Sequence, residues 1–148
     1  LTAAVNPMIW PDPLLDLVAL GIVGVVAHQA ADTRYLLQRG LGRIHDNPRP
    51  GLRALLQMSG LDSAQVTADD IGFQIGPRLN ASGRMETAKM AYDLLMSSDY
   101  QQAGILAQQL DDLNRSRQEM TRAHVERAEQ LVADQPDADI VIAFDPEL

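Results

Sequence analysis

The residues best suited to binding phosphate lie in one short stretch, residues 76–84, which reads G-P-R-L-N-A-S-G-R and contains no acid. Its proline and its second glycine predict a loop rather than a helix. Arg78, Asn80 and Arg84 would supply two guanidinium groups and an amide, beside small residues that let a ligand approach the backbone closely. A surface loop with two solvated arginines is the alternative, and residue chemistry alone leaves both open.

The histidines and the adjacent aspartates do not have the spacing of a metal-binding or catalytic site. The three histidines do not have a metal-ligand spacing, and no phosphate-binding or nucleophile motif occurs. Asp69 and Asp70 are adjacent, as are Asp111 and Asp112. Neighbours on a helix diverge by about 100° and do not share a site. We therefore expect a helix start at the first pair and a solvated face at the second.

Composition limits the class of protein. The chain has 148 residues, of which 46% are hydrophobic and 22% charged, as in a globular domain of ordinary size. Its net charge is −8, which argues against a general polyanion-binding surface, so nucleic acid would need a local basic site. The absence of cysteine fits a cytoplasmic protein. The most apolar stretch, residues 14–27, is shorter than the ~20 residues that cross a bilayer, so no membrane partner is expected.

Hydrophobic spacing predicts a mainly helical fold after an extended lead-in over residues 1–13. Residues 14–27 are apolar nearly all round and predict a buried helix, with a strand as the alternative. Further helices are expected over residues 33–44 (capped by Asp32), 51–59 (closed by Gly60), from a cap at Thr67 as far as Pro77, and 86–96.

The longest expected helix covers residues 99–133 and would be about 50 Å long. A heptad seam of apolar residues marks its first half: Ala103, Leu106, Leu110 and Leu113. Arg117 breaks that seam, and the charged residues around it predict a solvated face. We expect a helix that is packed at its start and exposed beyond Arg117, as a connector between two bodies would be.

Residues 139–144 predict a strand, which cannot be stable without partners. Together with a first residue that is not methionine, this suggests an internal piece of a longer protein that opens a second domain.

The 72–84 stretch resembles the G-F-x-[IL]-G-P-R-[IL]-N-A-x-G-R motif of the RecJ family, single-strand-specific DNA exonucleases of the DHH phosphoesterase superfamily. Three further segments are similar to that family in the same order: Leu15-Asp16-Leu17-Val18-Ala19-Leu20-Gly21, Asp32-Thr33-Arg34-Tyr35-Leu36-Leu37-Gln38-Arg39-Gly40-Leu41 and Leu110-Asp111-Asp112-Leu113-Asn114-Arg115-Ser116-Arg117.

The resemblance implies the rear of an α/β DHH domain (1–97), a long connecting helix (98–134) and the first strand of a DHHA1-type domain (135–148). It implies a parent enzyme that hydrolyses single-stranded DNA from 5′ to 3′ with Mn²⁺ or Mg²⁺, in recombination and repair. The family's DNA-facing residues would be Arg78, Asn80, Ala81, Gly83 and Arg84.

One departure from the family concerns the metal. The family's last metal motif has an aspartate where this chain has Val25, and valine cannot bind a hard cation. No catalytic or metal-binding residue carries over, so we expect the chain to be inactive alone and to hold no metal. Two alternatives remain: a helical interaction or regulatory module derived from a nuclease, and another DHH phosphoesterase that acts on short oligonucleotides. The oligomeric state cannot be deduced from these residues.

Overall fold

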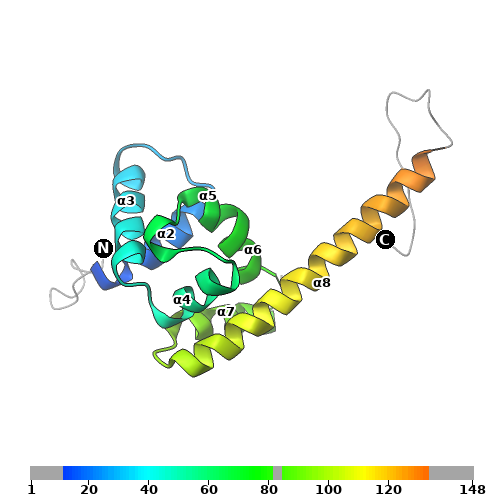
Figure 1. Cartoon of the computed structure of the whole chain (residues 1–148). Helices are drawn as coiled ribbons and strands as arrows, with labels where there is room; N and C mark the ends of the chain where they lie inside the picture. The colour runs from blue at the N-terminus through cyan, green and yellow to red at the C-terminus, as the bar shows by residue number, and fades with distance from the viewer. Residues whose placement is uncertain (1–11, 82–84, 134–148) are drawn as a thin grey trace.

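The computed structural model describes residues 12–81 and 85–133 as a cluster of short helices from which one long helix projects (Figure 1). Within those ranges all regular structure is helical. The elements in chain order are η1 (Asp12–Leu14), α2 (Leu15–Gly24), α3 (Ala31–Asp46), α4 (Pro50–Met58), η2 (Ser63–Gln65), α5 (Ala68–Asp70), η3 (Ile71–Ile75), α6 (Gly76–Leu79), α7 (Met85–Met96) and α8 (Tyr100–Val132). The expected mainly helical fold is confirmed, and the expected strand over residues 139–144 lies outside the described residues.

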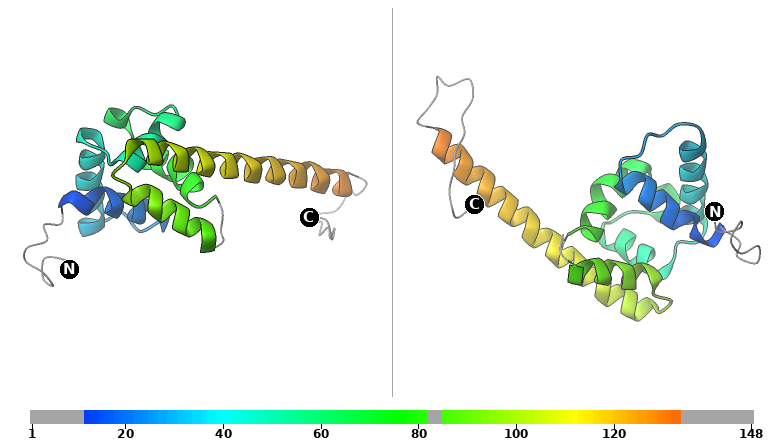
Figure 2. Two further views of the ribbon diagram at one scale, coloured as in Figure 1. Left: turned by 90° about the horizontal axis from the view of Figure 1, so that it is seen from below. Right: turned by 180° about the vertical axis from the view of Figure 1, so that it is seen from behind.

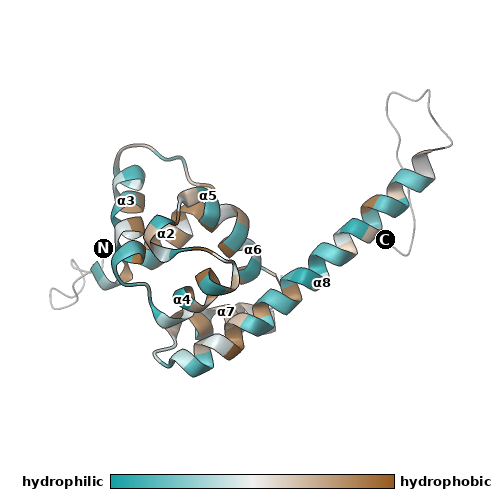
Figure 3. Ribbon diagram, in the orientation of Figure 1, coloured by the Kyte–Doolittle hydropathy of each residue, from teal (hydrophilic) through white to brown (hydrophobic). Residues whose placement is uncertain are grey.

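The core lies where α2, α3, α4, α7 and the first part of α8 meet, and Figure 3 colours large parts of the short helices as hydrophobic. The aliphatic side chains at its centre have almost no exposed surface: Ile44, Leu52, Leu55, Leu56, Ile71, Ile75, Leu94 and Leu110. A Cβ atom at Gly51 would overlap the carbonyl oxygen of Leu94, so glycine lets α4 approach α7 closely. None of the described helices combines the length and hydropathy needed to cross a membrane.

Helix α2 is shorter and less buried than its sequence predicts. Its buried residues lie in its first six positions, its main packing partner is α3, and the helix ends at Gly24 rather than Ala27. Val25 and Val26 are 75% and 89% exposed, and Val26 has a positive φ of 53°. Because a left-handed conformation cannot continue a right-handed helix, the chain turns here despite its apolar residues. The strand alternative is also wrong.

The first turn of α3 is arranged differently from our prediction. Asp32 lies within the helix instead of capping it, and the residue before the helix is Ala30. The Thr33 hydroxyl accepts a hydrogen bond from the Ala30 N–H at 3.1 Å and donates one to the His28 carbonyl at 2.6 Å. Two further expected helix ends are confirmed: Gly60 follows α4 with a φ of 69°, and the Thr67 side chain caps α5.

The helix that begins after Thr67 does not stop at Pro77, so that prediction was wrong. It continues through the π-helical segment η3 into α6, and residues 76–79 of the expected loop are helical. The Gly76 N–H bonds to the Ile71 carbonyl five residues earlier, as in a wider π turn. A proline in a regular helix clashes with the carbonyl four residues before it, and the wider turn relieves that clash at Pro77.

Helix α8 begins at its Asp99 cap, where the carboxylate accepts the Gln101 N–H at 2.9 Å. Both views in Figure 2 show α7 beside its first part and the remainder extending away from the bundle. Asn114 is the last buried residue before a long exposed run, which confirms the expected change near Arg117.

The buried face of α8 is rotated from the expected seam. Its buried members are Ala103, Ala107, Leu110, Asp111 and Asn114. Leu113 is instead 37% exposed, and Leu106 is half-buried. The expectation that Asp111 is solvated was wrong, because α6 packs on α8 at this level and covers it.

Candidate nucleic-acid interface

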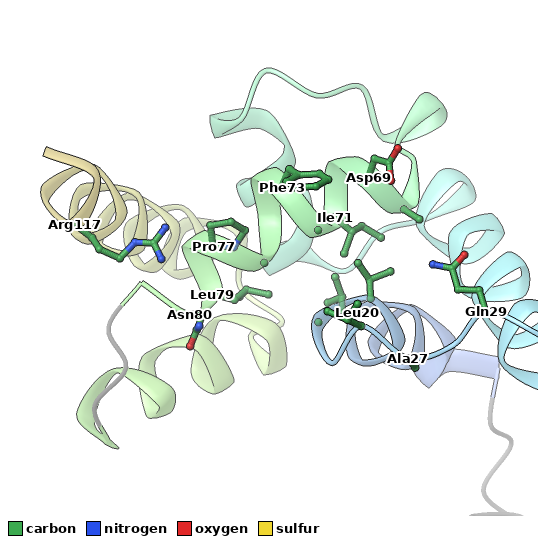
Figure 4. Close-up of a pocket in the computed structure, with 16 residues that line it drawn as sticks. Leu20, Ala27, Gln29, Asp69, Ile71, Phe73, Pro77, Leu79, Asn80 and Arg117 are labelled. Carbon is green, nitrogen blue, oxygen red and sulfur yellow. The ribbon is translucent and has the colours of Figure 1, made fainter. Parts of the chain in front are cut away.

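An open groove of about 710 Å³ runs between the C-terminal end of α2 and the continuous segment α5–η3–α6, and reaches α8 at one end (Figure 4). Leu20 of α2 and Ile71 of η3 lie along its length. Asn80 and Arg117 lie at the end nearest α8, and Asp69 lies toward the other. The groove therefore has a mainly apolar middle with a cationic and an acidic end.

The segment that forms one wall is fixed at its start by a reciprocal cap. Asp70 accepts hydrogen bonds from the Thr67 N–H at 2.9 Å and the Thr67 hydroxyl at 2.7 Å, and the Gln74 amide donates to it at 3.0 Å. These bonds favour the ionised carboxylate, so the Thr67 contacts and then Gln74 hold the pKa of Asp70 below its ordinary value. The wall is thus anchored at its beginning by local hydrogen bonds.

Arg78 anchors the other end of the same wall. Its Nε donates to Asp111 Oδ1 of α8 at 2.8 Å, and its Nη1 donates to the Gln74 carbonyl at 2.7 Å. The Asp111 side chain is fully buried, whereas that of Arg78 is 17% exposed. Arg115 approaches the second carboxylate oxygen of Asp111 to 2.7 Å. The arginine predicted to face DNA is therefore engaged in an internal ion pair, and whether it also contacts DNA stays a prediction.

Of the other residues predicted to face DNA, some lie in or near the groove and some lie outside the described part of the chain. Asn80 directly follows α6 and lines the groove, and its N–H bonds to the Gly76 carbonyl at 2.9 Å. Ala81 follows it and is half-buried. Gly83 and Arg84 lie outside the described residues. The structure thus places one predicted polar side chain in the groove.

Two groove residues were missed by sequence reasoning. Phe73 lines the groove from η3 with 82% of its surface exposed. Arg117 reaches it from α8, where its Nη2 donates to Asn114 Oδ1 at 3.2 Å. The sequence predicts only a solvated face around Arg117. The signal that could have found it is its neighbourhood: residues 113, 114, 120 and 121, one turn away on each side, include no acid.

The groove offers no metal site. Across residues 12–81 and 85–133, no three histidine, aspartate or glutamate groups lie close enough together to hold an ion. His45 Nε2 instead lies 2.8 Å from the Val66 carbonyl oxygen, as a structural contact. Val25, at the family's ligand position, is exposed and has no oxygen to offer. The residues present therefore do not fit a divalent cation.

Comparisons with known proteins show which proteins the chain is similar to. No protein-family model matches it. It is 50% identical over 108 residues to the single-stranded-DNA-specific exonuclease RecJ of Dickeya dadantii, a match that covers 72% of this chain and 19% of the relative.

Solved structures of RecJ from Thermus thermophilus match the fold as well. The complex with Mn²⁺ has a TM-score of 0.81 and 30% identity, over 97% of this chain and 22% of that one. The complex with Mg²⁺ has a TM-score of 0.77 and 30% identity, over 92% and 21%. The chain spans about a fifth of the length of the relatives it matches.

Proposed function

Because the chain corresponds to one segment of RecJ-family proteins, we propose that it is part of an enzyme that hydrolyses single-stranded DNA from 5′ to 3′ in the cytoplasm, during recombination and repair. The observation that carries this proposal is the agreement with a RecJ structure over 97% of the chain at a TM-score of 0.81. The groove beside the 72–84 motif supports this proposal. Its lining includes the guanidinium of Arg117, the amide of Asn80 and the ring of Phe73, which are groups that bind single-stranded DNA.

In this proposal the segment binds and positions DNA, and other parts of the enzyme supply the metal chemistry. The Thermus relatives were solved with Mn²⁺ or Mg²⁺, so the parent enzyme would use one of these ions to activate water at the scissile phosphate. Since the described residues hold no metal cluster, the ligands would come from elsewhere in the enzyme. The chain by itself is therefore expected to be inactive.

The proposed domain division follows the resemblance: residues 1–97 complete a DHH domain, 98–134 connect, and 135–148 open a DHHA1-type domain. The exposed second half of α8, which Figure 3 shows as mostly hydrophilic, fits a connector. The proposed DNA-facing set is Arg78, Asn80, Ala81, Gly83 and Arg84, and Arg78 also holds the motif on α8.

A direct test uses a fluorescently labelled single-stranded oligonucleotide and the purified chain. We expect weak binding that falls with added salt when measured by anisotropy, because released counterions drive phosphate contacts. Replacing Arg84 by alanine should weaken that binding. We also expect no cleavage of the oligonucleotide in the presence of Mn²⁺. Metal-dependent cleavage by the chain would contradict the proposed division of labour, and an absence of binding at low salt would contradict the proposed role in DNA contact.

A helical regulatory module derived from a nuclease is the second candidate. The exposed Val25 favours it, since this position cannot take part in metal chemistry, and the net charge of −8 also favours it. The full reading frame discriminates between the two candidates. An Asp-His-His motif upstream of this segment supports the enzyme, and a frame without it supports the module.

A further inference from the structure

Arg117 is the arginine that lines the groove. Arg39, Arg49, Arg78 and Arg115 each form an ion pair with an aspartate. Arg117 forms none among the described side chains, and the one partner of its guanidinium there is the neutral amide oxygen of Asn114. An arginine held by a neutral partner keeps its full charge for a ligand.

Asn114 also fixes where that charge is directed. Asn114 is 2% exposed and lies one turn before Arg117 on the packed face of α8. Its amide oxygen holds one nitrogen of the guanidinium, and Figure 4 shows the group turned toward Pro77 and the groove. Less conformational entropy is then lost when an anion binds than for a fully mobile arginine.

Phe73 supplies a second feature that the fold does not use. It is the most exposed of the described phenylalanine and tyrosine residues, at 82%, although it lines the groove between Ile71 and Pro77. An exposed ring in a groove is a stacking platform for an unpaired base, because every base has a π-face. Double-stranded DNA buries its bases in the duplex and would not offer them to this ring.

The charges along the groove indicate at which end of it a phosphate of the DNA strand would bind. Arg117 and Asn80 lie at one end, whereas Asp69, the groove's carboxylate, lies toward the other in Figure 4. A phosphate is thus attracted to the α8 end and repelled from the Asp69 end. The apolar middle between the two ends carries Phe73.

From these observations we infer that Arg117, Asn80 and Phe73 form a nucleotide-binding site for single-stranded DNA. The Arg117 guanidinium and the Asn80 amide contact a phosphate, and the Phe73 ring stacks on a base next to it. The inference rests on the proposed function in taking single-stranded DNA as the ligand. It goes further by assigning the phosphate contact to an arginine of α8.

The phosphate contact is tested with Arg117→Gln in the full chain and a labelled oligothymidine, by anisotropy at several salt concentrations. Arg122→Gln is the matched control, because it removes the same charge from the same helix but lies outside the groove. We expect Arg117→Gln to weaken binding about tenfold. It should also lower the salt slope by about 0.7, the contribution of one phosphate of a single strand. Arg122→Gln should leave both nearly unchanged.

The stacking contact is tested with Phe73→Ala, for which Tyr92→Ala on α7 is the control, since Tyr92 is also exposed, at 62%. We expect Phe73→Ala to weaken oligothymidine binding by about tenfold. An oligonucleotide made of abasic sites should lose this dependence on Phe73 and keep the dependence on Arg117. Circular dichroism melts of all four variants should match the unaltered chain, because these side chains are exposed.

The possible results distinguish an error in the Arg117–Asn80–Phe73 site from an error in the proposed function. If the unaltered chain binds oligothymidine and neither Arg117→Gln nor Phe73→Ala weakens binding more than its control, the site is wrong and the proposed function stands. If Phe73→Ala weakens abasic and ordinary strands equally, the stacking role is wrong. If the unaltered chain binds no single strand at low salt, the site and the role in DNA contact both fail.

Discussion

Two largely buried arginine–aspartate pairs lie in the described part of the chain, and they are built differently. Arg49 holds Asp16 through two nitrogens, Nε at 2.6 Å and Nη2 at 2.7 Å, and its remaining donors reach the Leu95 and Pro13 carbonyls. Arg78 holds Asp111 through Nε alone, and Asp111 also faces the exposed Arg115. The first pair matches one cation to one anion, whereas the second surrounds one anion with two cations.

The difference shows what each pair does for the fold. The Arg49–Asp16 pair joins α2 to the start of α4 and the end of α7, and both charges are satisfied internally. The Arg78–Asp111 pair joins α6 to α8 three residues before Asn114, which holds Arg117. We interpret the first as purely architectural, and the second as the anchor that sets α6 and α8 side by side at the groove.

The largest expected effect comes from Asp16→Ala, which leaves the Arg49 guanidinium without its carboxylate in a site where Asp16 is only 2% exposed. Removing one partner of a buried pair costs about 3–5 kcal/mol. Urea unfolding followed by circular dichroism measures the loss. The control is Asp112→Ala on the exposed face of α8, which should change stability by less than about 0.5 kcal/mol. A loss from Asp16→Ala no larger than the control's would remove the distinction between the pairs.

Arg78→Gln should destabilise the fold less, by about 2–3 kcal/mol, since Arg115 remains beside Asp111 and compensates part of its charge. The same unfolding experiment measures this loss. Hydrogen exchange should locate it, with faster exchange in α6 and the neighbouring part of α8 than in α2 and α3. An effect larger than that of Asp16→Ala would reverse the ranking of the two pairs, and uniform exchange would contradict a local anchor.

The smallest effect is expected for Arg115→Ala. Its side chain is 63% exposed, so water and salt screen its attraction to Asp111, and i,i+4 pairs of this kind contribute about 0.3–0.5 kcal/mol. The effect should shrink further in about 1 M salt. Unfolding at low and high salt measures both. A loss above about 1.5 kcal/mol that salt does not change would mean that Arg115, rather than Arg78, is the main partner of Asp111.

Local sequence signals predicted several elements because each is decided by neighbouring residues. Thr67 and Asp70 form their cap within one turn, and Gly60 supplies the positive φ that ends α4. The resemblance of the 72–84 stretch to RecJ was likewise visible in the sequence, and the comparisons confirm it. These features depend on residue order over a few positions.

Other features depended on packing that the sequence does not display. Asp111 and Asp112 are the same residue type. Asp111 is buried because it lies on the face of α8 that α6 and α7 contact, whereas Asp112 lies on the exposed face. Pro77 continues a helix because the preceding turn is wide. The sequence does not distinguish Arg117 from the other charged residues of α8, and only the folded chain shows that it lines the groove.

The sequence by itself thus determined the helices and most of their ends, since backbone preferences and capping act between near neighbours, and it displayed the resemblance to RecJ. Tertiary structure decided which charges are buried, which face of α8 is covered and which arginine is turned toward the groove. Burial and ion pairing join residues 33 positions apart, as Arg49 with Asp16 and Arg78 with Asp111, and only the folded chain brings such residues together.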